Sequence, residues 1–529
     1  MSIEALPNEL LVQIFNHLSW SRLSKKVSLV NRRWYHVVGM APLASKATLN
    51  LCKTDRLQPA YCGDYHIPLE VLQSSSREYS RFKISMHSME AEQLVDGTFG
   101  AVLQYCHHRW NIQNLSLTMC YYQFHLFLRH HTNLLSNVII VKIVVKDIPP
   151  PNGTIRDDEY RNAFPFMLPM EKLQNMDFEH RQFSNNYQSP PYVLVLITPN
   201  LETISIQRCV MRNNVRIVLQ HCPKLRSLFM FSRRPLRSSF VSDPLELENA
   251  TPQQMPSLSR LKLINVPLQS TLEPMFSNLQ TIYLAYVKIN PTSHTITCEN
   301  LTELMIDSLT LYEPLKLRVP QLKTLNCDMD VLKLLHLHDA LQTDQLIINM
   351  RYPSKGRPMD TARLTGLIHF RRLFLKLGQC YCYDAVWFNF LWSNLLGIVE
   401  LRIREKFPRD HLSRLQDVLE QFPQISQLQL QGTIIPNAFR FLPTSVKTIY
   451  IEDCSVVGSS VQFSPSVQRV RVRKLWSSND LPGCDVDGIQ LEPLGQFKPL
   501  HSTKVFRTND GPRMAYSTRE GCQSDETQD

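Results

Sequence analysis

Hydrophobic residues along this chain follow two periodicities. Within residues 6 to 38, Leu10, Ile14 and Leu18 recur at the spacing of one face of an amphipathic helix. Two shorter apolar patterns follow, so this segment predicts three short helices. From about residue 200 to 475 the apolar positions instead follow the spacing L-x-x-L-x-L. Alternation of apolar and polar positions is typical of strands with one buried face, so we expect many short strands there.

The spacing L-x-x-L-x-L recurs at regular intervals. Successive copies are separated by 21 or 22 residues between 258 and 343, by 27 or 28 residues between 343 and 425, and by 21 residues after that. These intervals are typical of leucine-rich repeats, which have 20 to 29 residues. The clearest copies begin at Leu201, Leu225, Leu258, Leu279, Leu301, Leu322, Thr343, Phe370, Ile398, Ile425, Val446 and Val467, and weaker copies at Ile112, Leu135 and Leu173.

The repeat lengths predict what connects the strands. A 21-residue repeat has room for a strand and a tight return, so we expect extended or 3₁₀ returns on most of the convex side. Helical patterns at 385–396 and 411–422 predict helices in the longer repeats. First strands are expected near 46–51 and 79–84, an exposed loop at 149–164, and a largely disordered tail from 477. Cysteine or threonine replaces the usual repeat asparagine at some positions, such as Cys454, where its side chain can still form a hydrogen bond.

The first 45 residues resemble a known family. The strings LPNELLVQIFNHL and VSLVNRRWYHV, with Leu23 between them, resemble the F-box. Asn31 stands where many members have Cys, and residues 19–22 replace an often acidic turn. Twelve positions match the pattern: Leu6, Pro7, Glu9, Leu10, Ile14, Phe15, Leu18, Leu23, Val27, Val30, Arg33 and Trp34. About 40 residues rarely support a core alone, so the segment needs a covering surface, either a partner or the neighbouring domain.

The resemblance implies a role. An F-box docks on a small Skp-type adaptor, which connects it to a cullin scaffold and a RING subunit. The chain would then be a non-catalytic substrate receptor of a ubiquitin ligase, with a protein target and no cofactor. The residues that would form the apolar contact with the adaptor are Leu6, Pro7, Leu10, Ile14, Phe15 and Leu18, supported by Leu23 and Trp34.

The expected fold is therefore α/β: a three-helix F-box at 1–45, irregular repeats at 46–200, regular repeats at 201–476 and a tail at 477–529. The repeats would form a curved solenoid with a parallel sheet on its concave face. Residues between the buried leucines would line that face and bind the target. The candidates are Phe229, Phe231, Arg260, Lys262, Tyr283, Arg402, Arg404, Arg469, Arg471 and Arg473. Aromatic and arginine side chains often dominate interfaces, although any solvated sheet face also shows mixed charge.

Composition narrows the function classes. The net charge is +10, from 57 Lys+Arg and 47 Asp+Glu, which is a mild bias over 529 residues. No apolar stretch approaches the roughly 20 residues that span a bilayer, and no secretory signal is visible. The 13 scattered cysteines suit free thiols in a reducing compartment. We therefore expect a cytoplasmic or nuclear protein without a membrane partner.

Alternatives to the receptor function remain. The F-box and the repeats could form an interaction scaffold that does not promote ubiquitination. The run of Arg469, Arg471 and Arg473 could meet an acidic or phosphorylated target segment. It could also bind nucleic acid, which is disfavoured because no aromatic residues alternate with it. His107, His108, His130 and His131 lack the spacing of a metal site, and no catalytic motif is present.

Overall fold

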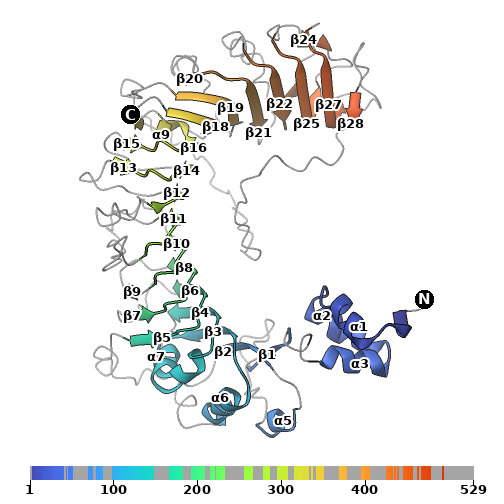
Figure 1. Cartoon of the computed structure of the whole chain (residues 1–529), viewed down its shortest axis with the longest axis vertical. Helices are drawn as coiled ribbons and strands as arrows, with labels where there is room; N and C mark the ends of the chain where they lie inside the picture. Colours follow the sequence, from blue (N-terminus) through green and yellow to red (C-terminus); the bar gives the residue numbers. More distant parts are fainter. Residues whose placement is uncertain are drawn as a thin grey trace, which may run out of the picture.

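The computed structural model divides into an N-terminal group of helices and a long parallel sheet (Figure 1). The structure describes residues 3–40, 43, 46–51, 69–75, 79–86, 98–147, 166–182, 192–208, 215–220, 222–232, 255–265, 278–285, 295–307, 315–332, 335–337, 341–350, 368–377, 395–405, 424–432, 434–435, 438–439, 445–456, 462–463, 466–477 and 491–493. The helix predicted at 411–422, the loop predicted at 149–164 and residues 385–394 of the other predicted helix lie outside these residues. The prediction of a helix is wrong for Leu395 and Leu396, which form a short strand paired with Ile368 and His369.

The three predicted N-terminal helices are present, with two 3₁₀ turns between and before them. They are η1 (Ile3–Ala5), α1 (Asn8–Phe15), α2 (Trp20–Lys25), η2 (Val27–Leu29) and α3 (Arg32–Gly39). Asn31 caps α3, because its side-chain oxygen accepts a hydrogen bond of 2.8 Å from the backbone N–H of Trp34. The position where the chain departs from the F-box pattern therefore has a local structural role.

The main sheet contains 20 strands within the described residues, and every pairing in it is parallel. Its long ladder consists of β1 (Thr48–Asn50), β2 (Arg81–Met86), β3 (Asn114–Cys120), β4 (Ile140–Asp147), β6 (Asn175–Gln182), β8 (Thr203–Arg208), β10 (Ser227–Ser232), β11 (Arg260–Ile264), β12 (Thr281–Ala285), β14 (Glu303–Asp307), β16 (Thr324–Asp328), β18 (Leu341–Met350), β19 (Ile368–Leu377), β21 (Glu400–Glu405), β22 (Gln427–Gln431), β25 (Thr448–Val456), β27 (Arg469–Ser477) and β28 (Leu491–Pro493). The short strands β20 (Leu395–Leu396) and β23 (Ile434–Ile435) pair with β19 and β25. All twelve regular copies of the spacing predicted from the sequence lead into, or lie within, a strand of this ladder.

A short turn sets the start of many strands. Before β8, Pro199 follows Thr198, and the backbone N–H of Leu201 donates to the Thr198 carbonyl at 3.1 Å. Proline favours the second position of such a turn because its φ is already fixed. Leu225 and Leu322 close equivalent turns. The leucine then points into the core, and the strand begins two residues later.

One weak copy was predicted three residues out of register. The sequence suggested that Leu135, Val138 and Ile140 form the buried set, but Ile140 is 46% exposed. In the ladder Ile140 pairs with Asn114 and Asn175, which precede the buried positions. Val138, Val141 and Ile143 are the buried set instead. Leu135 is buried too, in a 3₁₀ turn. Hydrophobic periodicity alone therefore does not distinguish the two registers.

Short strands form the return segments on the outer side of the bend (Figure 1). They belong to three small parallel sheets: β5 (Phe166–Pro169), β7 (Tyr192–Ile197) and β9 (Val215–Gln220); β13 (Thr295–Thr297), β15 (Leu315–Arg318) and β17 (Leu335–Leu337); and β24 (Ala438–Phe439) with β26 (Gln462–Phe463). The prediction of extended returns is thus confirmed for these segments. The main sheet lies on the inner side of the bend.

Helices cover the sheet near its N-terminal end, which the sequence did not predict. They are α5 (Leu69–Gln73), α6 (Thr98–Arg109) and α7 (Tyr121–His130), and a further turn, α9 (Met329–Leu332), follows β16. In the segment predicted as a disordered tail, β28 pairs with β27, so that prediction is wrong for residues 491–493.

Candidate functional site

Exposed apolar side chains concentrate on the N-terminal helices. Within the described residues, seven of the nine large hydrophobic side chains that are exposed lie between residues 3 and 40. Leu10 is 42% exposed and Ile14 43%, one turn apart on α1, while Leu29 after α2 is 76% exposed. The other four are Ile3, Val30, Tyr35 and Met40. We call these seven residues the apolar patch. Such clustering marks a surface that another molecule covers.

The sequence-predicted adaptor residues divide into exposed and buried groups. Leu10, Ile14 and Pro7 are exposed, and Leu6, Leu18 and Trp34 are half-buried. Phe15 and Leu23 belong to the core of the helical domain, so any effect of theirs on docking is through the positions of their neighbours. Leu29 and Tyr35 of the apolar patch were not among the predicted residues, because they lie out of phase with the helical stripe.

Specific contacts position the exposed face of α1. The Phe15 and Trp34 rings pack edge to face, with centroids 4.9 Å apart, and hold α3 against α1. Arg33 of α3 donates from Nε to Asn8 Oδ1 at 2.9 Å and from its terminal nitrogen to the Leu6 carbonyl. At the other end of α1, Lys46 donates to the carbonyls of Asn16 and Leu18. With Leu11 and Phe15 turned inward, Leu10 and Ile14 must face outward.

The second candidate surface is the open face of the main sheet, formed by the side chains at alternate strand positions that do not enter the core. On β10 to β12 it carries a cluster of aromatic and cationic groups. Lys262 Nζ lies 4.9 Å from the Phe229 ring centroid and 4.8 Å from the Tyr283 centroid. Phe231 stacks beside Phe229 at 6.5 Å. Burial lowers the pKa of Lys262. The structure therefore brings four of the predicted target-binding residues together, with Arg260 exposed at the edge of the cluster.

A second cluster lies on β19 to β22. The Arg402 guanidinium lies over the Phe374 ring at 4.6 Å and donates to Gln431 Oε1 at 3.0 Å. Lys376 Nζ is 5.4 Å from the same ring centroid, and Arg404 is exposed on the same strand as Arg402. Burial is the main cause that lowers the pKa of Arg402. We call Phe374, Lys376, Arg402 and Arg404 the Arg402 cluster.

The terminal arginines continue the open face. Arg469 is exposed, and Arg471 lies over the Tyr450 ring of the adjacent strand at 5.7 Å. Arg473 belongs to β27, but its side chain is outside the described set. The sequence prediction overlooked Tyr450 because parallel pairing brings it beside Arg471 from a different repeat.

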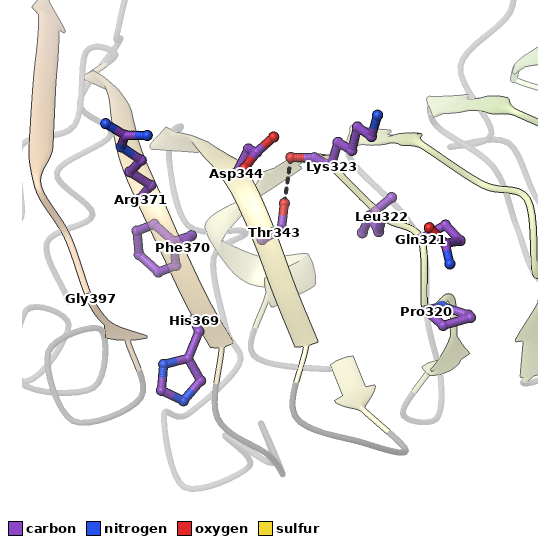
Figure 2. A pocket seen from close by; sticks show the side chains of 10 residues that line it. All are labelled: Pro320, Gln321, Leu322, Lys323, Thr343, Asp344, His369, Phe370, Arg371 and Gly397. Atoms are coloured by element: carbon purple, nitrogen blue, oxygen red, sulfur yellow. Dashed lines mark hydrogen bonds between the residues drawn. The ribbon is translucent and has the colours of Figure 1, made fainter.

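A shallow groove lies at the edge of the sheet where β16, β18 and β19 begin (Figure 2). Thr343 Oγ1 donates to the Lys323 carbonyl there at 2.6 Å. Lys323, Asp344 and Arg371 on its rim are exposed and carry opposite charges. Gly397 closes the groove with φ +81°, a conformation that favours glycine. This open, mixed rim gathers no chemistry beyond that of an ordinary surface.

Several histidines lie on or beside α6 and α7. His125 and His131 are buried in and beside α7, and His107 and His108 lie at the end of α6. The described part of the chain brings together no three potential metal ligands. No helix in that part is both long and apolar enough to cross a bilayer.

Comparison with known families identifies the N-terminal helices. Residues 3–41 match the family model described as F-box-like. No curated protein matches the chain. The match supports an F-box protein and implies binding of a Skp-type adaptor; members of this family are generally non-catalytic adaptor-binding subunits. The matched segment contains the whole apolar patch.

Proposed function

We propose that this chain is the target-recognition subunit of a Skp–cullin–F-box type ubiquitin ligase. The apolar patch docks the Skp-type adaptor, and the adaptor joins the chain to the cullin and RING subunits. The chain contributes proximity between a bound target and the ubiquitin-charged enzyme, so the chemistry takes place on other subunits.

The long sheet serves, in this proposal, as the concave face of a leucine-rich-repeat solenoid that holds a protein target. Three features support this: parallel strands at the repeat intervals, buried and mostly aliphatic residues at fixed positions in the repeats, and short return strands on the outer side. The open face is broad and carries aromatic and cationic clusters, which suits a protein target better than a small metabolite. The protein would be located in the cytoplasm or the nucleus.

The observation that carries the proposal is the exposure of Leu10 and Ile14 within a segment that matches the F-box. An apolar anchor that enters a partner's pocket contributes most of the binding energy of such an interface. A carboxylate at either position would be buried without a partner when the adaptor docks. That arrangement costs several kcal/mol.

The double substitution Leu10→Asp and Ile14→Asp tests this directly. We expect it to reduce capture of a purified Skp-type adaptor by at least about a hundredfold. Both side chains face outward, so the helices should stay folded. Val71→Asp is the matched control, because Val71 is exposed on α5 outside the matched segment and should leave capture unchanged. Full adaptor capture by the double variant would contradict the proposal.

A second measurement separates a ligase receptor from a scaffold that binds without ubiquitination. Proteins captured by the open face should gain ubiquitin in a reconstituted reaction with the wild-type chain and should not with the double variant. A bound target that gains no ubiquitin in the reaction with the wild-type chain would favour the scaffold.

A further inference from the structure

Contacts with two neighbouring side chains hold Arg402 of the Arg402 cluster in place. Arg402 is held on one side by the Phe374 ring, at 4.6 Å, and at one terminal nitrogen by Gln431. Its Nε is buried and has no hydrogen-bond partner among the described residues. A guanidinium held in this way is arranged in advance for an anion, because little side-chain entropy is lost when the anion binds.

Charges around Phe374 favour an anionic ligand. The described side chains on the open face of β19, β21, β22 and β25 include four cations, Arg372, Lys376, Arg402 and Arg404, and two carboxylates, Glu400 and Glu452. The Glu400 carboxylate is 3.3 Å from Arg372 Nε and is paired with it. The local net charge is therefore +2, with Glu452 and Glu400 the carboxylates whose charges act on Arg402.

Burial decides which anion fits. Arg402 is partly withdrawn from water, so a ligand that reaches it must lose water as well. The desolvation cost rises steeply with the charge on a group, and a carboxylate carries half the charge of a phosphate dianion. A guanidinium edge also matches a planar carboxylate, which can accept two parallel hydrogen bonds. Arg404 lies next to Arg402 on the same face and is exposed, so it can receive a second carboxylate.

We infer that the Arg402 cluster binds an acidic segment of the target, with one carboxylate on Arg402 and a neighbouring carboxylate on Arg404. The inference rests on the proposed function, since it names the chemistry of the target that the open face holds. It requires no modification of the target before binding.

The test uses the full-length chain and three pools of short labelled peptides with random flanking residues. The central position of each pool is fixed as Glu-Glu, Gln-Gln or a single phosphoserine. We expect the chain to bind the Glu-Glu pool about tenfold or more tightly than the Gln-Gln pool, which is the effect of a partly desolvated charge-assisted contact. Arg402→Gln should abolish this preference.

Two further variants keep the outcome interpretable. Arg404→Gln removes an exposed charge that stacks on no ring among the described residues, so it should lower the preference without affecting folding. Arg318→Gln is the control, because Arg318 is exposed on β15 in a separate small sheet and should leave the preference unchanged. The inference is overturned if wild type does not discriminate, if phosphoserine is preferred while Glu-Glu is not, or if both cluster variants keep the preference.

Adaptor capture is measured on the same preparations. Because Arg402 and Arg404 lie far along the chain from the apolar patch, both variants should capture the adaptor as wild type does. If the wild-type chain does not capture the adaptor, the proposed function is overturned. If it captures the adaptor but shows no peptide preference, only the anion site is overturned.

Discussion

Arg33 connects parts of the helical domain that are 25 to 27 residues apart in the chain. Its guanidinium donates to the Asn8 side chain and to the Leu6 carbonyl, at the start of α1. The apolar patch depends on this contact, because the direction of α1 determines where Leu10 and Ile14 point. A half-buried arginine that bridges two elements therefore contributes to docking without being part of the docking surface.

Arg33→Ala should destabilise the helical domain by about 1 to 2 kcal/mol, since two hydrogen bonds are lost at a site that water partly reaches. Faster hydrogen exchange at the amides of α1, such as that of Leu11, would show the effect. The neighbouring Arg32 is exposed on the same helix, so Arg32→Ala should leave those amides protected. Equal exchange in both variants would show that Arg33 has no such role.

The stability of α7 should depend on pH. His125 is buried on this helix, and burial, followed by the charges of Arg129 and His130, lowers its pKa to about 4 from an ordinary value of 6.5. The unfolded chain therefore binds more protons than the folded chain between these two values. Stability is complete above about pH 6.5 and is lost as the pH falls toward 4.

Thermal unfolding followed by circular dichroism at pH 7 and pH 5 checks this expectation. The wild-type midpoint should fall between these values, and His125→Phe should reduce the fall, because it removes the proton-binding group while keeping an apolar ring. His17→Gln, at an exposed position just after α1, should not. A fall of the same size in wild type and His125→Phe would exclude His125 as the cause.

The strands of the regular repeats were predictable, and their order in the sheet follows from the regular intervals. Cys454 also behaves as expected, because its buried Sγ donates to the Leu430 carbonyl at 3.4 Å. The helices α6 and α7 were not predicted, because in them buried aromatic and polar residues are mixed: Gln123 and His125 are buried beside Phe124.

The apolar stripe of α1 was predictable too, but periodicity could not show that Leu11 and Phe15 face the domain's own core while Leu10 and Ile14 face outward. Contacts such as Arg471 with Tyr450 depend on strand register across repeats, which no local pattern encodes.

The described residues form two separate hydrophobic cores. One contains described residues from Leu11 to Leu43, the other contains residues from Leu49 to Val470, and they share no member. The helical domain lies beside the β1 end of the sheet and does not stack on it (Figure 1). Adaptor docking and target docking can therefore be separated experimentally.

Removal of residues 1–45 should abolish adaptor capture and leave the sheet folded. We expect its thermal unfolding midpoint to stay within a few degrees of the full-length value, because the larger core loses no member. The Glu-Glu peptide preference should also persist in this shortened chain. Aggregation or a much lower midpoint would show that the helical domain stabilises the sheet.

The parallel ladder sets the distances between side chains on the open face. Tyr283 on β12 and Phe374 on β19 are separated by three strands, β14, β16 and β18. At a strand spacing of about 4.8 Å, this interval is about 19 Å. Each strand contacts only its immediate neighbours. The insertion or deletion of one repeat would therefore change the distance between Tyr283 and Phe374 by one strand spacing and leave the surroundings of both residues intact. Under the proposed function, the stack would select a target by the distance between its features as well as by their chemistry.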